Sequence, residues 1–109
     1  MLLRELPDGS VVVAFAEDDL RRPVDVHAAF EDLIFERGVR RITADLSEVR
    51  ALTSLMIGTL VSLHLLAYEN VVILSFTGMH EKLVALFRLI GIDKLMEAHY
   101  APPAEGANA

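Results

Sequence analysis

Cysteine is absent from this 109-residue sequence. Its absence excludes disulfide frameworks, thiolate nucleophiles and cysteine-based zinc sites, and it fits a reducing compartment, so we expect a cytoplasmic protein. Basic residues are also few, because 10 Lys and Arg stand against 16 Asp and Glu and leave a net charge of -6. Nucleic-acid binding requires a surface that neutralises phosphates, so we expect no nucleic-acid partner.

Long apolar runs are missing as well. The longest, from 55 to 68, is interrupted by Gly, Thr, Ser and His and is shorter than the roughly 20 residues that a membrane span needs. Two acidic residues within the first eight positions interrupt the apolar stretch that a signal peptide requires. We therefore expect neither membrane insertion nor secretion by that route.

The sequence has no clustered glycines and no paired histidines. Its six glycines are isolated, which argues against a phosphate-binding loop, and its four histidines do not share the spacing that brings two ligands to one metal. No serine stands in a nucleophile-elbow pattern. We therefore expect no cofactor, no metal and no enzymatic activity.

What is present is enough apolar material for one core, since 53% of the residues are apolar and 24% are charged. Alternating apolar residues, helical periodicity and turn residues predict strands that alternate with helices after an initial hairpin. The expected strands are 2–6, 10–16, 41–46, an interior strand 71–76 and an edge strand 97–100, and the expected helices are 23–38, 54–69 and 79–90. This order predicts an α/β domain over residues 1–100, with a mixed sheet of four to five strands and a disordered tail over 101–109.

The segment 45–60 carries a hydroxyl pair where a strand-following loop becomes a helix. The Ser54 oxygen is expected to cap the first turn of that helix. A phosphate on Ser54 would add about -1.5 to -2 charges, which the positive helix end tolerates but a docked partner does not. The segment therefore predicts a helix cap or a phosphorylation switch.

The same helix is expected to pack one side on the sheet and to present an uncharged side. Residues at 100° per position fall into two groups: Ile57, Val61, His64 and Tyr68 on one face, and Leu55, Thr59, Ser62 and Leu66 on the other. Leu55, Leu66 and the neighbouring Leu63 indicate an exposed apolar patch. Either a partner or another element of the same chain would cover it.

Three motifs resemble those of the STAS domain, the family of anti-sigma factor antagonists. Residues 16–20 (AEDDL) are similar to the family's G-E-L-D-L loop, residues 45–49 (DLSEV) to its D-L-S-x-V strand end, and residues 86–95 (LFRLIGIDKL) to its closing L-x-x-x-G-L-D-x-L. The resemblance implies a sheet with helices and no catalysis. It also implies partner switching, in which the antagonist binds an ATP-binding anti-sigma kinase until that kinase phosphorylates it.

Carried over by position, the resemblance places Ser54 on the family's phosphorylated serine, Asp19 on its acidic loop residue and Gly58 on its second glycine. Thr53, Leu55 and Met56 depart from the family's D-S-S-G-L-G pattern; Thr53 is an alternative acceptor, and the other two add bulk where a kinase would approach. The expected partner-binding set is Asp19, Thr53, Ser54, Leu55, Met56, Gly58, Thr59 and Ser62.

These departures also leave a second hypothesis open. A STAS-like chain with a degenerate motif can serve as a structural subunit that is never phosphorylated, in a stress-sensing assembly or a lipid-transport ABC system. The family's last helix has no counterpart after Met96, which would uncover a surface for a second copy and so predicts a possible homodimer.

Overall fold

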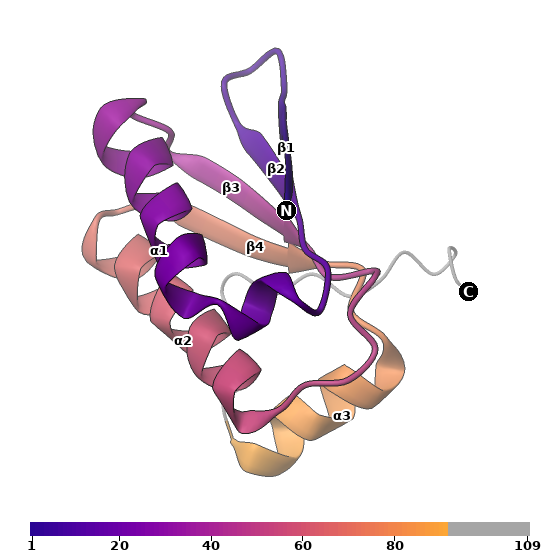
Figure 1. Cartoon of the computed structure of the whole chain (residues 1–109). Helices are drawn as coiled ribbons and strands as arrows, with labels where there is room; N and C mark the ends of the chain where they lie inside the picture. Colours follow the sequence, from indigo (N-terminus) through magenta and orange to yellow (C-terminus); the bar gives the residue numbers. More distant parts are fainter. Residues whose placement is uncertain (92–109) are drawn as a thin grey trace.

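The computed structural model describes residues 1–91. The chain builds a sheet and three main helices in alternation after an initial hairpin (Figure 1). Its elements are β1 (Leu2–Glu5), β2 (Val11–Ala14), the 3-10 turn η1 (Asp19–Arg21), α1 (Pro23–Glu31), the π-helical segment η2 (Asp32–Glu36), β3 (Arg41–Asp45), α2 (Ser54–Glu69), β4 (Ile73–Thr77) and α3 (Glu81–Ile90).

The sheet is mixed, with the strand order β1-β2-β3-β4. β1 pairs antiparallel with β2 across the predicted hairpin, whereas β2, β3 and β4 are parallel neighbours. The parallel pairs are joined by α1 and by α2, as the crossover rule for such units requires. The predicted α/β domain with a four-to-five-stranded mixed sheet is therefore confirmed.

Helices α1 and α2 lie side by side on one face of the sheet, and α3 lies at the end of the molecule where α2 begins (Figure 1). The covered face is made by alternate residues of the parallel strands, because side chains alternate across a strand. The register aligns Val11 with Ile42 and Leu74, all of which are buried, whereas Thr43 and Ser75 on the other face are only partly buried. One face of the sheet thus carries the core.

Two predicted elements differ from the observed ones. The helix expected over 23–38 is α-helical only to Glu31; η2 then widens to a π-turn, in which the Arg37 N–H donates to the Asp32 carbonyl at 3.1 Å. Gly38 has φ +66° and ends the helical segment as predicted. A π-segment leaves the apolar periodicity almost unchanged, so sequence pattern does not reveal it.

The prediction that residues 71–76 form an interior strand is wrong within the described part of the chain. β4 is one of the two outer strands of the four that the structure describes, and its burial alternates, with Leu74 and Phe76 inside. A continuous apolar run does not by itself distinguish a strand covered on both faces from one covered on a single face. The expected edge strand 97–100 and the tail 101–109 lie outside the described residues.

Candidate docking and modification site

The candidate site forms where the loops that follow the parallel strands come together. The β2–η1 loop, the β3–α2 loop and the β4–α3 loop all leave the carboxyl ends of their strands, which meet at one edge of a parallel sheet. Two contacts confirm that these loops touch: Glu17 bonds the β3–α2 loop, and the His80 ring lies 2.9 Å from the Ser47 carbonyl. Of the predicted site residues, Asp19 lies in η1, Thr53 ends the β3–α2 loop, and the others lie on α2 between Ser54 and Ser62.

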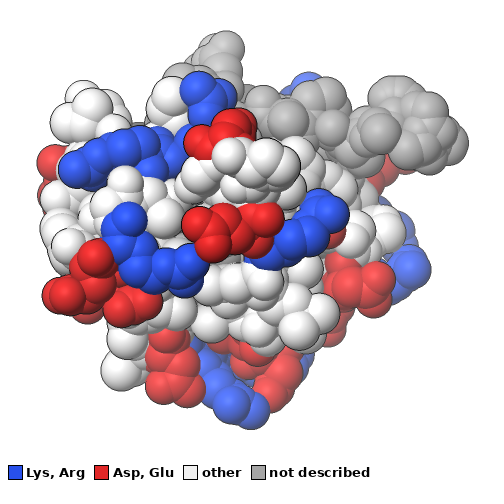
Figure 2. Space-filling view, turned by 90° about the horizontal axis from the view of Figure 1, so that it is seen from above, with Lys and Arg blue, Asp and Glu red and all other residues white. Residues whose placement is uncertain are grey.

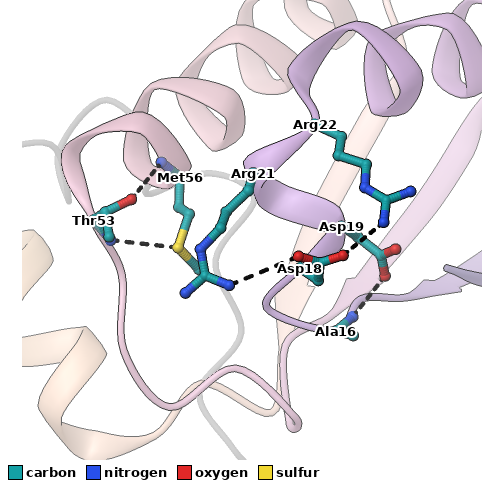
Figure 3. Close-up of polar contacts among 7 residues, drawn as sticks. All are labelled: Ala16, Asp18, Asp19, Arg21, Arg22, Thr53 and Met56. Carbon is teal, nitrogen blue, oxygen red and sulfur yellow. Dashed lines mark hydrogen bonds and ion pairs between the residues drawn. The ribbon is translucent and has the colours of Figure 1, made fainter.

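Thr53, not Ser54, is the N-cap of α2. The Thr53 hydroxyl accepts a hydrogen bond from the Met56 N–H at 3.3 Å, and the Thr53 N–H donates to the Met56 sulfur at 3.4 Å (Figure 3). This is a capping box in which a thioether stands where a carboxylate or amide is usual. The prediction that Ser54 caps the helix is therefore wrong by one residue.

Met56 is fully buried by this arrangement. Its bulk therefore points into the protein and not toward an approaching enzyme, contrary to the expectation from its place in the motif. Leu55, which is 52% exposed, supplies the apolar bulk beside the modification site. Of the two bulky departures from the family pattern, only Leu55 meets the solvent.

Ser54 is the first residue of α2 and is exposed. Within residues 1–91 its hydroxyl has no hydrogen-bonded partner, so modification would break no contact there. The first N–H groups of a helix lack intrahelical acceptors and carry a positive partial charge, which favours an anion at this position. No acidic residue lies in the first turn of α2 to oppose it.

Asp19 is engaged within its own segment. Its carboxylate accepts the Ala16 N–H at 2.8 Å and lies 2.9 Å from the amino group of Met1. Burial raises the pKa of Asp19, but the Ala16 hydrogen bond and the Met1 ammonium outweigh it and leave the pKa below its ordinary value. The side chain keeps 21% exposure, so a partner can still reach it.

The neighbouring Asp18 behaves differently. It is exposed and forms ion pairs with two arginines of its own segment, at 2.7 Å to Arg22 and 3.9 Å to Arg21 (Figure 3). In Figure 3 the Arg21 side chain extends from η1 toward Met56. The Arg22 side chain points instead toward Asp18, so of these two arginines only Arg21 is directed toward α2.

Glu17 is a functional candidate that the sequence did not reveal. One of its carboxylate oxygens accepts the backbone N–H groups of Arg50 at 2.8 Å and Ala51 at 3.2 Å. These two bonds lower the pKa of Glu17 against the opposing effect of its partial burial. The residue order gives no sign of this contact, because the bonded backbone groups lie 33 and 34 residues away.

Thr59 is buried, at 3% exposure, and therefore does not offer its side chain to a partner. Its hydroxyl lies 2.9 Å from the Leu20 carbonyl and 3.0 Å from the Leu55 carbonyl, so its single proton is shared between η1 and its own helix. The expected role of Thr59 in direct partner binding is corrected to that of an internal tie. Gly58 is exposed and Ser62 is half-buried, so both remain accessible.

The two faces expected for α2 were assigned about a quarter turn away from the observed ones. The buried side carries Met56, Thr59, Leu60, Leu63, His64, Leu66 and Ala67. The predicted outer patch is therefore wrong for Leu63 and Leu66, which lie in the core, and right for Leu55. The exposed residues of the helix are instead Ser54, Leu55, Gly58, Leu65, Tyr68 and Glu69, and the first four of these form an uncharged strip with the half-buried Ser62 beside it.

His64 is 4% exposed and is packed inside the protein. Within residues 1–91, no group of three or more His, Asp or Glu side chains is arranged to hold a metal ion. No helix in the same range combines the length and the apolar character needed to traverse a bilayer.

On the face of the molecule that Figure 2 shows, acidic and basic side chains lie intermixed.

Comparison with known proteins gives its result at the level of structure. No protein-family model matches the sequence, and no curated protein matches it. Solved structures do match: a chain in the molecular architecture of the stressosome, described as a signal integration and transduction hub, superposes with a TM-score of 0.76 at 16% identity over 94% of this chain and 86% of that one.

Two further structures agree with it. A variant of RsbS from Moorella thermoacetica gives a TM-score of 0.77 at 17% identity, over 93% of this chain and 85% of that chain. The protein TM1081 gives a TM-score of 0.71 at 16% identity, over 96% of this chain and 82% of that chain. At such low identity the likeness concerns the fold, and the STAS-type fold that the three sequence motifs predicted is confirmed.

Proposed function

We propose that this chain is a non-enzymatic regulatory binding module, an anti-sigma factor antagonist that works by partner switching and is controlled by phosphorylation of Ser54. The observation that carries the proposal is the position of Ser54, exposed at the first residue of α2 beside the exposed Leu55. In this proposal the partner is a cytoplasmic serine kinase of the ATP-binding anti-sigma type. It docks on the start of α2 and the Asp19 loop.

The switch follows from the charge that a phosphate adds. A phosphoserine carries about -1.5 to -2 charges at pH 7, and the helix end at Ser54 stabilises such a group within the protein. A partner that packs on Leu55 would have to desolvate the same dianion. A loss of about 3 kcal/mol weakens binding by roughly 150-fold, which is enough to release a partner.

Thr53 is the alternative acceptor, and the geometry favours Ser54 over it. The Thr53 hydroxyl already accepts the Met56 N–H, so an enzyme that modifies Thr53 has to act on the group that holds the helix start. The Ser54 hydroxyl makes no hydrogen bond among residues 1–91 and does not cap the helix. We therefore assign the phosphate to Ser54.

The structural neighbours support a signalling role. One belongs to an assembly described as a signal integration and transduction hub, and another is RsbS. Both share the fold of this chain over more than nine tenths of its length.

The proposal is tested by incubating the protein and ATP with each purified ATP-binding anti-sigma kinase encoded in the same genome, followed by site mapping with mass spectrometry. We expect one phosphate on Ser54, lost in Ser54→Ala. Ser47→Ala is the matched control, because Ser47 is also exposed and its hydroxyl makes no hydrogen bond in the described part of the chain. Phosphate on neither Ser54 nor Thr53 with any of these kinases would contradict the switch.

A second candidate function is a structural STAS subunit, and the exposed strip of α2 favours it. Leu55, Gly58, Ser62 and Leu65 are spaced 3, 4 and 3 residues apart, which is the seam spacing of packed helices, and none of them is charged. A shallow hollow of about 350 Å³ adjoins the strip and is lined by Ser62 together with Pro23, Val24, His27, Ala28 and Glu31. A copy of this chain or a larger assembly would then cover the strip.

Light scattering coupled to size-exclusion chromatography distinguishes this candidate. If two copies pair through the strip, Leu65→Glu yields a monomer where the wild type is a dimer. Leu89→Glu, at an apolar residue that is 82% exposed on α3, is the matched control and leaves the dimer intact. A wild type that stays monomeric at high concentration removes the homodimer.

A further inference from the structure

Two loops far apart in the sequence are joined by a single carboxylate. Glu17 follows β2, and one of its oxygens accepts the N–H groups of Arg50 and Ala51 in the β3–α2 loop. Hydrogen bonds to an ionised acceptor are about twice as strong as neutral ones. The contact therefore fixes the last part of the loop before α2.

The remainder of that loop is held from other directions. At its beginning, the Asp45 carboxylate accepts the Ser47 N–H at 2.9 Å, and the His80 ring bonds the Ser47 carbonyl. At its end, the Thr53 N–H donates to the Met56 sulfur. Between these points lie residues 50–52. In the described part of the chain, the hydrogen bonds from their backbone N–H groups go to Glu17, from Arg50 and from Ala51.

The contact of Glu17 with Arg50 and Ala51 lies close to the candidate phosphorylation site, Ser54. Ala51 stands three residues before Ser54, and the bonded segment runs directly into the capped start of α2. Arg50 and Ala51 are both exposed, so water would take over their freed N–H groups if Glu17 were removed. Loss of Glu17 would therefore loosen the segment more than it would destabilise the fold.

We propose that Glu17 is a positioning residue for the Ser54 switch: it holds residues 50–53 in the conformation in which the kinase finds Ser54, without itself touching the kinase. This inference rests on the proposed function. It differs from the roles of the two residues that follow Glu17. Asp18 pairs with arginines of its own segment, and Asp19 bonds Ala16 within the same loop.

The test compares Glu17→Ala, Glu17→Gln and Glu17→Asp with Asp18→Ala as the matched control. The first readout is the hydrogen exchange of the Arg50 and Ala51 amides, which does not depend on any partner. Loss of both bonds in Glu17→Ala should speed that exchange by about tenfold or more. Glu17→Gln keeps an acceptor oxygen at the same reach but loses the charge, so its exchange should lie between those of the wild type and Glu17→Ala, and Asp18→Ala should not change.

Glu17→Asp keeps the charge but is one methylene shorter, so it should exchange like Glu17→Ala. It also keeps the inference testable if Glu17→Ala does not fold. The second readout is kcat/KM for phosphorylation of Ser54 by the kinase that modifies the wild type. We expect a decrease of about tenfold in Glu17→Ala and Glu17→Asp, and a smaller decrease in Glu17→Gln.

Each outcome is decisive. Faster amide exchange together with wild-type kcat/KM would make Glu17 a structural tie only and would overturn the inference while the proposed function stands. Unchanged amide exchange in Glu17→Ala would overturn it as well, because the contact would not hold the loop. If no kinase modifies wild-type Ser54 or Thr53, the proposed function fails and this inference fails with it.

Discussion

Adjacent residues at the start of α2 have different tasks. The Thr53 hydroxyl is bonded to the backbone, whereas the Ser54 hydroxyl is exposed and free of contacts within residues 1–91. The structure thus separates the cap from the candidate acceptor. A side chain that can be modified without loss of the helix start is what a reversible switch requires.

Substitution of these two residues should therefore affect stability unequally. Thr53→Ala removes the cap and should lower the free energy of unfolding by about 1 kcal/mol. Ser54→Ala should change it by less than about 0.5 kcal/mol, as is usual for exposed positions. Urea denaturation of both variants measures the difference. Equal losses would mean that the cap is not where the geometry places it.

The pH dependence of stability belongs to the same scale. The pKa values of Glu17, Asp19 and Asp8 are all lowered in the folded protein, that of Asp8 by its hydrogen bonds from the Ser10 side chain and backbone. A carboxyl whose pKa is lower in the folded than in the unfolded chain stabilises the fold when the pH is above the pKa that it has in the unfolded chain. That contribution to stability disappears as the pH falls through the pKa that the carboxyl has in the folded protein.

We expect the free energy of unfolding to decrease below about pH 4, where these carboxyls bind protons more readily in the unfolded chain. Glu17→Gln should flatten part of this decrease, because the amide does not titrate. Urea denaturation of both proteins between about pH 3 and pH 7 tests the sign. A stability that rose on acidification would contradict it.

At the scale of elements, the sequence pattern located α2 well and oriented it poorly. The apolar run and the flanking polar residues predicted a helix at 54–69, and the structure has Ser54–Glu69. Its faces were misassigned because α2 contacts α1, η1 and β4, which bury a broad arc and leave little periodicity to follow. Burial on several sides hides a helix's orientation from its own sequence.

The sequence predicted the residues of the candidate site that lie in local motifs, but not those whose role depends on distant contacts. Motif order led to the prediction of Asp19 and Ser54 as site residues, since a local pattern carries both. Glu17 as a tie and Thr59 as an internal bond were not predictable, because each depends on a backbone group more than 30 residues away. Such contacts are set by tertiary packing and leave no spacing to read.

Two glycines test how the elements are built. Gly58 lies on the exposed side of α2 with open space where a Cβ would stand, so Gly58→Ala should raise the free energy of unfolding by about 0.5–1 kcal/mol through helix propensity. At Gly78, φ is +71° and a Cβ would meet the Asp45 carboxylate at 2.9 Å and the Ser47 nitrogen at 3.0 Å.

Gly78→Ala should therefore destabilise the protein, by about 1 kcal/mol or more, because it strains the backbone and pushes on the β3–α2 loop at once. Thermal unfolding of the two variants gives the comparison. A Gly78→Ala protein as stable as the wild type would show that the loop yields at no cost, and would weaken the case that it is held firmly.

At the scale of the molecule, the mixed sheet explains why the site is where it is. Parallel strands bring their carboxyl ends to one edge, so the loops after β2, β3 and β4 gather there although they are far apart in the sequence. The hairpin strand β1 runs antiparallel to β2, so it brings its amino-terminal end to this edge, where the Met1 amino group lies 2.9 Å from the Asp19 carboxylate. The fold thus supplies a rigid frame under a surface of loops and one helix end.

The central claim is that a phosphate on Ser54 releases a partner from this surface. The most direct measurement is isothermal titration of the ATP-binding anti-sigma kinase with the unmodified protein and with the protein phosphorylated at Ser54. We predict that phosphorylation weakens the affinity by roughly 100-fold or more, equivalent to about 3 kcal/mol. Equal affinity of the two forms would contradict the account.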